Sequence, residues 1–424
     1  MTIQVTPSWN GCSQISYGRL RVTIVHNMQT HRPRTFSEFL KYLLVFPLAP
    51  LACSCEPIAL AWSPNSNRIA AVGRATMDTR SVLVLSLLEV KVPSQGTAPI
   101  PVPALRALRD AVADDGFISV PAWSPDGMYL AYYRYQGAKT ASTRPTGREE
   151  GPTRSAADHP PSIVDAELVV LRTDTREQRA LRTVRWKARR SPPGALAPEA
   201  IPSPVWSKDS TCIFYASLRG AQDEYQVDGV SLKGMKKTIG MSSNDGRIWA
   251  SVSRPTVAAL SDGKIILNQL EPAKRWSVPI PGTLSRDVVE FSGDLRVAAF
   301  LGKDALIVID VASGRTHAIL QGGDVASTVG IALSGDGRNL YSLVRTRADL
   351  DPSKRSRCQV RRVDIGSKKE STLFTCPDVG QATMLSVSPD EKRIVVIMKH
   401  GPGSGKDGFS VIGDGGRVLM EIGS

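Results

Sequence analysis

One pattern of apolar and polar residues recurs along most of this chain: an apolar strand end, a serine, a short polar turn and a second apolar strand. Proline presets the backbone for such a turn, aspartate and serine side chains bind its amides, and glycine accepts a positive φ. The pattern therefore predicts pairs of short antiparallel strands. It occurs in six segments: LAWSPNSNRIAAV (60–72), PAWSPDGMYLAYY (121–133), PVWSKDSTCIFYA (204–216), VEFSGDLRVAAF (289–300), IALSGDGRNLYSL (331–343) and LSVSPDEKRIVVI (385–397).

Certain positions of the repeat are expected to serve the fold alone. The large residue before each serine would pack between neighbouring sheets, while the serine and the aspartate bind turn amides. We assign this structural role to Trp62, Ser63, Trp123, Ser124, Asp126, Trp206, Ser207, Ser334, Asp336, Ser388 and Asp390.

A second hairpin follows each copy of the repeat, and one more hairpin lies in the long gap between the third and fourth copies. The seven segments are 81–92, 166–181, 224–239, 264–278, 304–320, 358–374 and 409–422. Two hairpins make one four-stranded sheet, and several such sheets close into a ring.

The spacing of the repeat serines predicts the number of sheets. The steps between them are 61, 83, 85, 42 and 54 residues, whereas one propeller blade takes roughly 40–45 residues. We therefore predict an all-β fold, a seven-bladed β-propeller of four-stranded antiparallel blades, with six or eight blades as alternatives. In blade four the inner strands are expected at 247–253 and 256–261, or the inner turn at 243–246.

The segment Trp123-Ser124-Pro125-Asp126-Gly127 resembles the W-S-P-D-G motif of the TolB-type, WD-repeat-like propeller family. The resemblance covers residues 57–424. It implies a propeller that binds a protein or peptide, but a fold of this kind does not fix an activity.

The first 56 residues are set apart from the repeat. We interpret residues 1–27 as a disordered upstream extension, 28–52 as a signal peptide and 53–56 as a short linker. Basic residues precede the apolar run Tyr42–Ala52, which ends in small residues and is too short to span a bilayer. Leu51-Ala52-Cys53 resembles a bacterial lipobox, which implies lipidation of Cys53 and a place on the periplasmic or extracellular side of the cell envelope. A plainly cleaved signal and a buried apolar segment remain as alternatives.

The formal net charge of +13 favours anionic partners. The densest basic stretch, called here the basic strand, comprises Arg182, Arg185, Trp186, Lys187, Arg189 and Arg190. It could grip phosphate or carboxylate groups while the tryptophan stacks on the ligand, or it could be a solvated strand whose tryptophan packs on the blade. Nucleic acid is a partner only if the export signal is wrong.

Long segments are predicted on the propeller face opposite the serine turns, where binding usually resides. They are Gly137–Asp165, Val184–Pro202, Arg347–Arg357 and His400–Asp407. The segment Gly137–Asp165 could equally be disordered, because it is rich in Pro, Gly, Thr and Arg.

The sequence shows no set of residues with catalytic or metal-ligand spacing, so we predict no enzyme activity, no metal and no cofactor. Cys358 and Cys376 are equidistant from Ser367, the centre of their hairpin, so they could form a disulfide in an oxidising compartment. A register shift of one residue would separate them.

Two functional hypotheses follow. The first is an exported, lipid-anchored binding module for an envelope protein or peptide, which reaches the membrane through its lipid alone. The second is a sensor or enzyme for a glycan or lipid, such as an anionic phospholipid or polysaccharide, which uses the central channel and requires inward-pointing carboxylate or histidine pairs from different blades. The oligomeric state stays open.

Overall fold

The structure is a computed structural model of the chain. It describes residues 4–7, 12–17, 20–25, 56–77, 80–90, 100–101, 107–112, 116–136, 162–191, 195–198, 203–219, 224–281, 288–302, 305–321, 327–346, 357–375, 381–399, 408–413 and 418–423. Contacts between residues divide the chain into two units, Met1–Ala52 and Cys53–Ser424. Among the described residues no helix is long and apolar enough to cross a membrane. The predicted signal peptide and Cys53 lie outside these residues.

The first unit contains a three-stranded antiparallel sheet of β1 (Gln4–Pro7), β2 (Cys12–Tyr17) and β3 (Leu20–Val25). The alternation of apolar and polar residues in β2 and β3, together with the two-residue connection implied by the pairing of Tyr17 with Leu20, favours this sheet. The interpretation of residues 1–27 as an upstream extension stays a prediction.

The described residues of the second unit form seven sheets. Blade one contains β4 (Glu56–Trp62), β5 (Arg68–Met77), β6 (Arg80–Glu89) and β8 (Ala107–Val112). Blade two contains β9 (Phe117–Ile118), β10 (Ala122–Trp123), β11 (Tyr129–Tyr135), β12 (Ser162–Arg172), β13 (Gln178–Ser191) and β14 (Ala195–Pro198). Blade three contains β15 (Val205–Trp206), β16 (Cys212–Leu218), β17 (Tyr225–Ser231) and β18 (Lys236–Ser243).

The remaining four sheets follow the same plan. Blade four contains β19 (Ile248–Ala250), β20 (Thr256–Ser261), β21 (Lys264–Leu270) and β22 (Ala273–Pro279). Blade five contains β23 (Val288–Phe291), β24 (Val297–Leu301), β25 (Ala305–Asp310) and β26 (Thr316–Gln321). Blade six contains β27 (Thr328–Leu333), β28 (Asn339–Thr346), β29 (Arg357–Asp364) and β30 (Glu370–Thr375). Blade seven contains β31 (Gln381–Val387), β32 (Arg393–Lys399), β33 (Gly408–Gly413) and β34 (Val418–Gly423).

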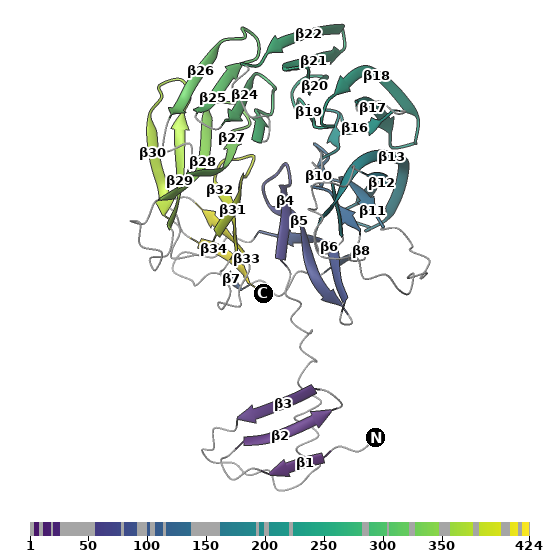
Figure 1. The fold of residues 1–424 in the computed structure, drawn as a ribbon, viewed down its shortest axis with the longest axis vertical. Helices are drawn as coiled ribbons and strands as arrows, with labels where there is room; N and C mark the ends of the chain where they lie inside the picture. Colours follow the sequence, from purple (N-terminus) through teal and green to yellow (C-terminus); the bar gives the residue numbers. More distant parts are fainter. Residues whose placement is uncertain are drawn as a thin grey trace, which may run out of the picture. The chain divides into compact units, whose positions relative to one another are not determined.

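The first strand of each blade lies at the centre of the ring. First strands contact the first strands of neighbouring blades, as β10 contacts β15 and β23 contacts β27, and β31 contacts β4 to complete the circle (Figure 1). The predicted all-β propeller of four-stranded antiparallel blades is confirmed.

The ring closes between blades seven and one by two kinds of contact. The Asp390 N–H donates to Ser66 Oγ at 3.1 Å, and the Arg393 guanidinium donates to the Ser66 carbonyl. Asp126 N–H donates to Ser210 Oγ in the same way between blades two and three. In addition β7 (Ile100–Pro101), from the segment between β6 and β8, pairs in parallel with β34. The ring is therefore closed by an added parallel strand as well as by contacts between inner turns.

The hydroxyl of the repeat serine stabilises the inner turn through hydrogen bonds. In blade two the buried Ser124 hydroxyl donates to Asp126 and accepts the Tyr129 N–H at 2.9 Å, while Asp126 accepts the Met128 N–H at 2.9 Å. The same bonds recur at the serines Ser207, Ser292, Ser334 and Ser388. Because the hydroxyl satisfies an amide that the turn would otherwise leave unpaired, a serine at this position stabilises the strand pair.

The repeat tryptophans join neighbouring blades. Trp123 Nε1 donates to the Ala61 carbonyl at 3.0 Å, and Trp206 Nε1 donates to the Ala122 carbonyl at 2.9 Å. Each indole therefore packs against the inner strand of the preceding blade. Trp62 is equally buried, but its Nε1 has no hydrogen-bond partner among the described residues.

Blade four follows the first of the two predicted arrangements. Its inner strands are β19 and β20, and its inner turn runs from Ser251 to Pro255. Ser253 stands where most other blades have an aspartate, and Ser251 Oγ accepts the amides of Ser253 and Arg254 at 3.2 Å each. The repeat was hard to recognise here because its aspartate is missing.

Antiparallel order places the inner turns on one face of the ring and the connections between second and third strands on the other. We call these the turn face and the loop face. On the loop face β20 and β21 are joined by Asp262 and Gly263 alone, whereas 26 residues separate Tyr135 of β11 from Ser162 of β12. The two faces therefore differ in what they can present to a partner.

Candidate functional site at the propeller channel

One position of the inner strands, two residues before the serine of the inner turn, is half-buried in every blade. The seven residues are Ala61, Ala122, Val205, Trp249, Glu290, Ala332 and Ser386. Glu290 is therefore the single ionisable group of this set.

The pKa of the Glu290 carboxyl is raised to about 7, mainly because burial disfavours its charged form, while nearby Arg247 partly offsets the effect. Glu290 lies in blade five, whereas Arg247 lies directly before β19 of blade four. At neutral pH this carboxyl is divided between its acid and its carboxylate form, so it can donate or accept a proton or a hydrogen bond.

Arg247 is held in place by the loop that leads from blade three into blade four. Its Nε lies 2.7 Å and its Nη2 2.6 Å from Asp245 Oδ2, and its own amide donates to Asp245 Oδ1 at 2.9 Å. This loop belongs to the loop face, because it follows an outermost strand. The arrangement therefore places an oriented guanidinium on the loop face, near a protonatable carboxyl.

Such a pair suits a ligand that carries a carboxylate, phosphate or polar chain end. A guanidinium binds an anionic group through paired N–H donors. Among the described residues no group of histidine, cysteine, aspartate or glutamate side chains is arranged to hold a metal. The chemistry that the described residues supply here is charge pairing and proton exchange.

The basic strand lies in β13, and its tryptophan is not available to a ligand. Trp186 is fully buried against Tyr133, with ring centroids 4.4 Å apart, and against Phe117. The predicted stacking of Trp186 on a ligand is therefore wrong, because the pleat of the strand turns this residue into the core. The alternative, a tryptophan packed on its blade, holds.

Some cations of the basic strand bind the neighbouring blade, and others are exposed to solvent. Arg182 Nη2 donates to the Gly234 carbonyl of blade three at 2.8 Å. The amides of Arg185 and Lys187 donate to Ser217 Oγ and Tyr225 Oη of that blade at 3.0 and 3.2 Å. The Arg185 side chain is exposed, with its Nε 3.8 Å from Asp165. The side chains of Arg189 and Arg190 lie outside the described residues, so binding of an anionic partner there stays a prediction.

Only one of the two cysteines of the predicted disulfide lies among the described residues. Cys358 is buried in β29, while Cys376 lies outside the described residues. Gln359 pairs with Thr375 and Val360 with Phe374, which is the register that the prediction requires. The disulfide itself stays a prediction.

Sequence reasoning missed the channel residues. Glu290 could have been found by aligning the six repeats, because the residue before the large repeat position is uncharged in the other five. Asp245 and Arg247 carried no such signal, because blade four lacks the repeat motif.

Comparison with known proteins adds little beyond the fold. No family model and no curated protein matches the chain. Among solved structures it is similar to hydrazine synthase from Kuenenia stuttgartiensis (13% identity, 69% of this chain and 76% of that chain covered, TM-score 0.42). It is also similar to U3-55K (10%, 82% and 90%, 0.44) and to TolB from Acinetobacter baumannii (12%, 100% and 79%, 0.38). Likenesses this distant carry no argument about function.

Proposed function

We propose that this chain is a non-catalytic, exported binding module, a TolB-like lipoprotein anchored through Cys53, which binds an envelope protein or peptide at its loop face and channel mouth. The observation that carries the proposal is the unequal length of the connections on the loop face. Long segments separate the second and third strands of blades two, six and seven, while blade four closes with two residues. Long connections on one rim of a rigid scaffold are where partners are usually bound.

The channel mouth supports the same proposal. Asp245 and Arg247 lie on the loop face, so a polypeptide held by the long connections would have an oriented guanidinium within the same surface. Arginine is among the residues that contribute most to binding in protein interfaces.

A capture experiment tests the proposal. The purified chain is used as bait in envelope fractions, and partners are quantified by mass spectrometry. Replacement of residues 138–160 by a short Gly-Ser linker, and separately Arg247→Gln, should each reduce recovery of a partner at least about tenfold, because each removes contacts from the binding surface. Lys208→Gln, an exposed residue on the turn face, is the matched control. Equal recovery by all variants would refute the role of the loop face.

Export and lipidation have a separate test. Intact-mass analysis of the protein from its native membrane should show an N-terminus at Cys53 that carries acyl chains. An unprocessed N-terminus would remove the anchor and the envelope location from the proposal.

A second candidate function, binding of a glycan or lipid in the channel, is favoured by Glu290. Recognition of sugar hydroxyls suits a carboxyl that can either donate or accept, and its pKa of about 7 keeps both forms present. Titration with envelope polysaccharides, with product analysis, should show binding that Glu290→Gln weakens. Absence of binding by the wild-type chain would eliminate this candidate.

A further inference from the structure

The turn face carries an uneven distribution of charge that the fold does not require. The position four residues after the repeat serine is uncharged in blades one, two and three, where Asn67, Met128 and Thr211 occupy it. In blades five, six and seven the same position holds Arg296, Arg338 and Lys392. In blade four Arg254 lies one residue earlier in the turn. We call Arg254, Arg296, Arg338 and Lys392 the cationic arc.

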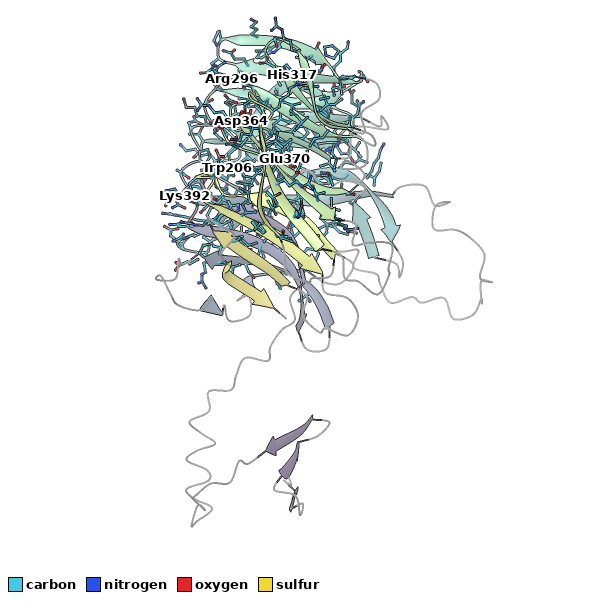
Figure 2. All side chains as sticks on the ribbon, turned by 90° about the vertical axis from the view of Figure 1, so that its left-hand side faces the viewer. Trp206, Arg296, His317, Asp364, Glu370 and Lys392 are labelled. Carbon is cyan, nitrogen blue, oxygen red and sulfur yellow. The ribbon has the colours of Figure 1, made fainter. Side chains whose placement is uncertain are left out.

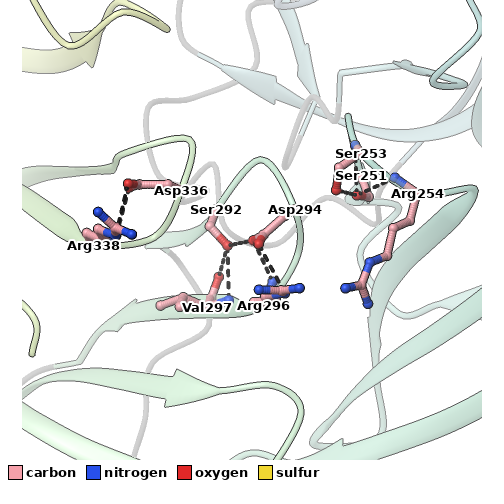
Figure 3. Close-up of polar contacts among 9 residues, drawn as sticks. All are labelled: Ser251, Ser253, Arg254, Ser292, Asp294, Arg296, Val297, Asp336 and Arg338. Atoms are coloured by element: carbon pink, nitrogen blue, oxygen red, sulfur yellow. Dashed lines mark hydrogen bonds and ion pairs between the residues drawn. The ribbon is translucent and has the colours of Figure 1, made fainter.

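The two central arginines of the arc are oriented by the aspartates of their own turns. Arg296 Nε lies 3.3 Å from Asp294 Oδ2, and Arg338 Nε lies 3.4 Å from Asp336 Oδ2 (Figure 3). Because the Nε side of each guanidinium is engaged, both Nη groups remain for a partner. A cation held in one orientation loses less conformational entropy when it binds.

The aspartates of these turns do not neutralise the positive charge of the cationic arc at the surface. Asp294 and Asp336 also accept the hydroxyl of the repeat serine and a turn amide, which hold them against the turn. The side chain of Arg296 is 61% exposed and that of Asp294 20%, while Arg338 is 82% and Asp336 50% exposed. In both turns the cation is therefore the more exposed member of the pair.

Arg254 has no such acid beside it. Ser253 takes the place of the aspartate in this turn and contacts Ser251 Oγ at 3.2 Å (Figure 3). Among the described residues no carboxylate lies within ion-pair distance of Arg254, whose side chain is exposed. Seen from the side, Arg296 and Lys392 lie toward the same face of the ring (Figure 2).

An exposed valine and two glycines lie next to the cationic arc. Val252 is 60% exposed, and its amide donates to the Gly293 carbonyl of blade five at 2.8 Å. Gly293 has no room for a side chain, since an added Cβ would lie 3.1 Å from the Gly335 carbonyl and 3.3 Å from Val252 Cγ2. Nothing lies within 4 Å of a Cβ added at Gly335, so the space above that residue is open.

We propose that the cationic arc binds an acidic peptide segment whose carboxylates meet the oriented guanidiniums and whose aliphatic side chain contacts Val252. Carboxylates match the paired Nη donors of arginine. The open space above Gly335 lets an extended peptide approach the backbone closely. A flat membrane surface would meet all seven blades equally, but blades one to three carry no cation at the shared position. This surface lies opposite the one in the proposed function and does not depend on it.

The experiment uses substitutions that the protein already contains elsewhere. Arg296→Asn, Arg338→Asn and Lys392→Thr copy the residues found at the same position in blades one and three, so the turns should keep their geometry. The probe is a fluorescein-labelled peptide of alternating Glu and Val, followed by fluorescence anisotropy on the full chain. The triple variant should bind it at least about tenfold more weakly than the wild type, and added salt should weaken the wild type.

Several controls decide the result. Lys208→Asn removes a cation of the turn face outside the arc and should leave binding unchanged, and the same peptide with Gln for Glu should not bind. The inference is overturned if the triple variant binds normally, if Lys208→Asn weakens binding as strongly, or if the Gln peptide binds equally well. It is also overturned if phosphatidylglycerol vesicles or single-stranded DNA, in place of the peptide, bind in an arc-dependent manner.

A further variant separates this inference from the proposed function. Replacement of residues 138–160 should reduce capture of the envelope partner at least about tenfold and leave the Glu–Val peptide bound. Loss of peptide binding in that variant would assign the peptide to the loop face and overturn the inference.

Discussion

The chain contains two basic regions, one contiguous in sequence and one drawn from four blades, that serve different purposes in the structure. In the basic strand of blade two, Arg182 donates a hydrogen bond to a carbonyl of blade three, and Trp186 is buried in the core. In the cationic arc of the turn face, the side chain of Arg338 is 82% exposed. The first region is largely part of the packing between blades, and the second is left free for a partner.

The difference arises from what the backbone of each region already provides. In β13 the side chains alternate between the core and solvent, so the strand itself decides which residues are buried. In the inner turns the serine and the aspartate satisfy the amides, so the residue four positions after the serine has no task in folding. Charge is therefore informative about function where the turn has already been stabilised by other residues.

The largest expected effect comes from the basic strand. Trp186→Ala should lower the free energy of unfolding by about 3–5 kcal/mol, because it empties a fully buried site against Tyr133. Chemical denaturation measures this loss, and the Glu–Val peptide should still bind at temperatures where the variant is folded. Trp186→Phe is the matched variant. It should cost less, under about 1.5 kcal/mol, since the Nε1 that it removes is buried without a partner among the described residues. Equal stability of the alanine variant would mean that the tryptophan is accessible after all.

Glu290 differs from both basic regions, because burial of its carboxylate lowers the stability of the fold. Its pKa rises from 4.5 to about 7 on folding, so the folded chain binds an extra proton between these values. The wild-type free energy of unfolding should therefore fall as the pH rises from 4.5 to about 7 and level off above that, whereas that of Glu290→Gln should not. At pH above 8 the variant should be more stable than the wild type by about 3 kcal/mol, and the advantage should vanish below pH 4.5. Denaturation across this pH range measures it. An advantage that persists in acid would show that burial of the carboxyl is not the cause.

A smaller effect is expected where the turn scaffold supports the arc. Ser334→Ala leaves the Asn339 amide without its acceptor at 2.9 Å and releases Asp336, which should lower the free energy of unfolding by about 1–2 kcal/mol. The same change should weaken the Glu–Val peptide modestly, because Asp336 no longer orients Arg338. Calorimetry on the variant and on Ser277→Ala, an exposed serine, measures the first effect. Peptide binding that is unchanged would show that the aspartate does not position the guanidinium.

The repeat made most of the fold predictable. Its serine, aspartate and large apolar residue each have a local task, so their spacing alone located the inner strand pairs. The strand β7 was not predictable, because a two-residue segment, Ile100–Pro101, has too little alternation to signal a strand. It gains its hydrogen bonds only once blades one and seven are neighbours.

The candidate site was less predictable than the fold. The pKa of Glu290 depends on how closely adjacent blades pack around it, which no local pattern records. The exposed ends of Arg296 and Arg338 likewise follow from their ion pairs with turn aspartates. The position of Trp186 could have been inferred, since Val184 and Trp186 share one side of a strand and Val184 is buried as well.

The smallest expected effect is also the most decisive for the comparison. Arg338→Asn should change the free energy of unfolding by less than about 0.5 kcal/mol, because an exposed ion pair contributes little and Asn67 fills the same position in blade one. Arg182→Met, its counterpart in the basic strand, removes a donor to the Gly234 carbonyl and should cost clearly more. Urea denaturation of both variants at the same pH gives the two values side by side. If Arg338→Asn were as costly as Arg182→Met, the arc would belong to the scaffold, and its exposed guanidiniums would no longer indicate a partner.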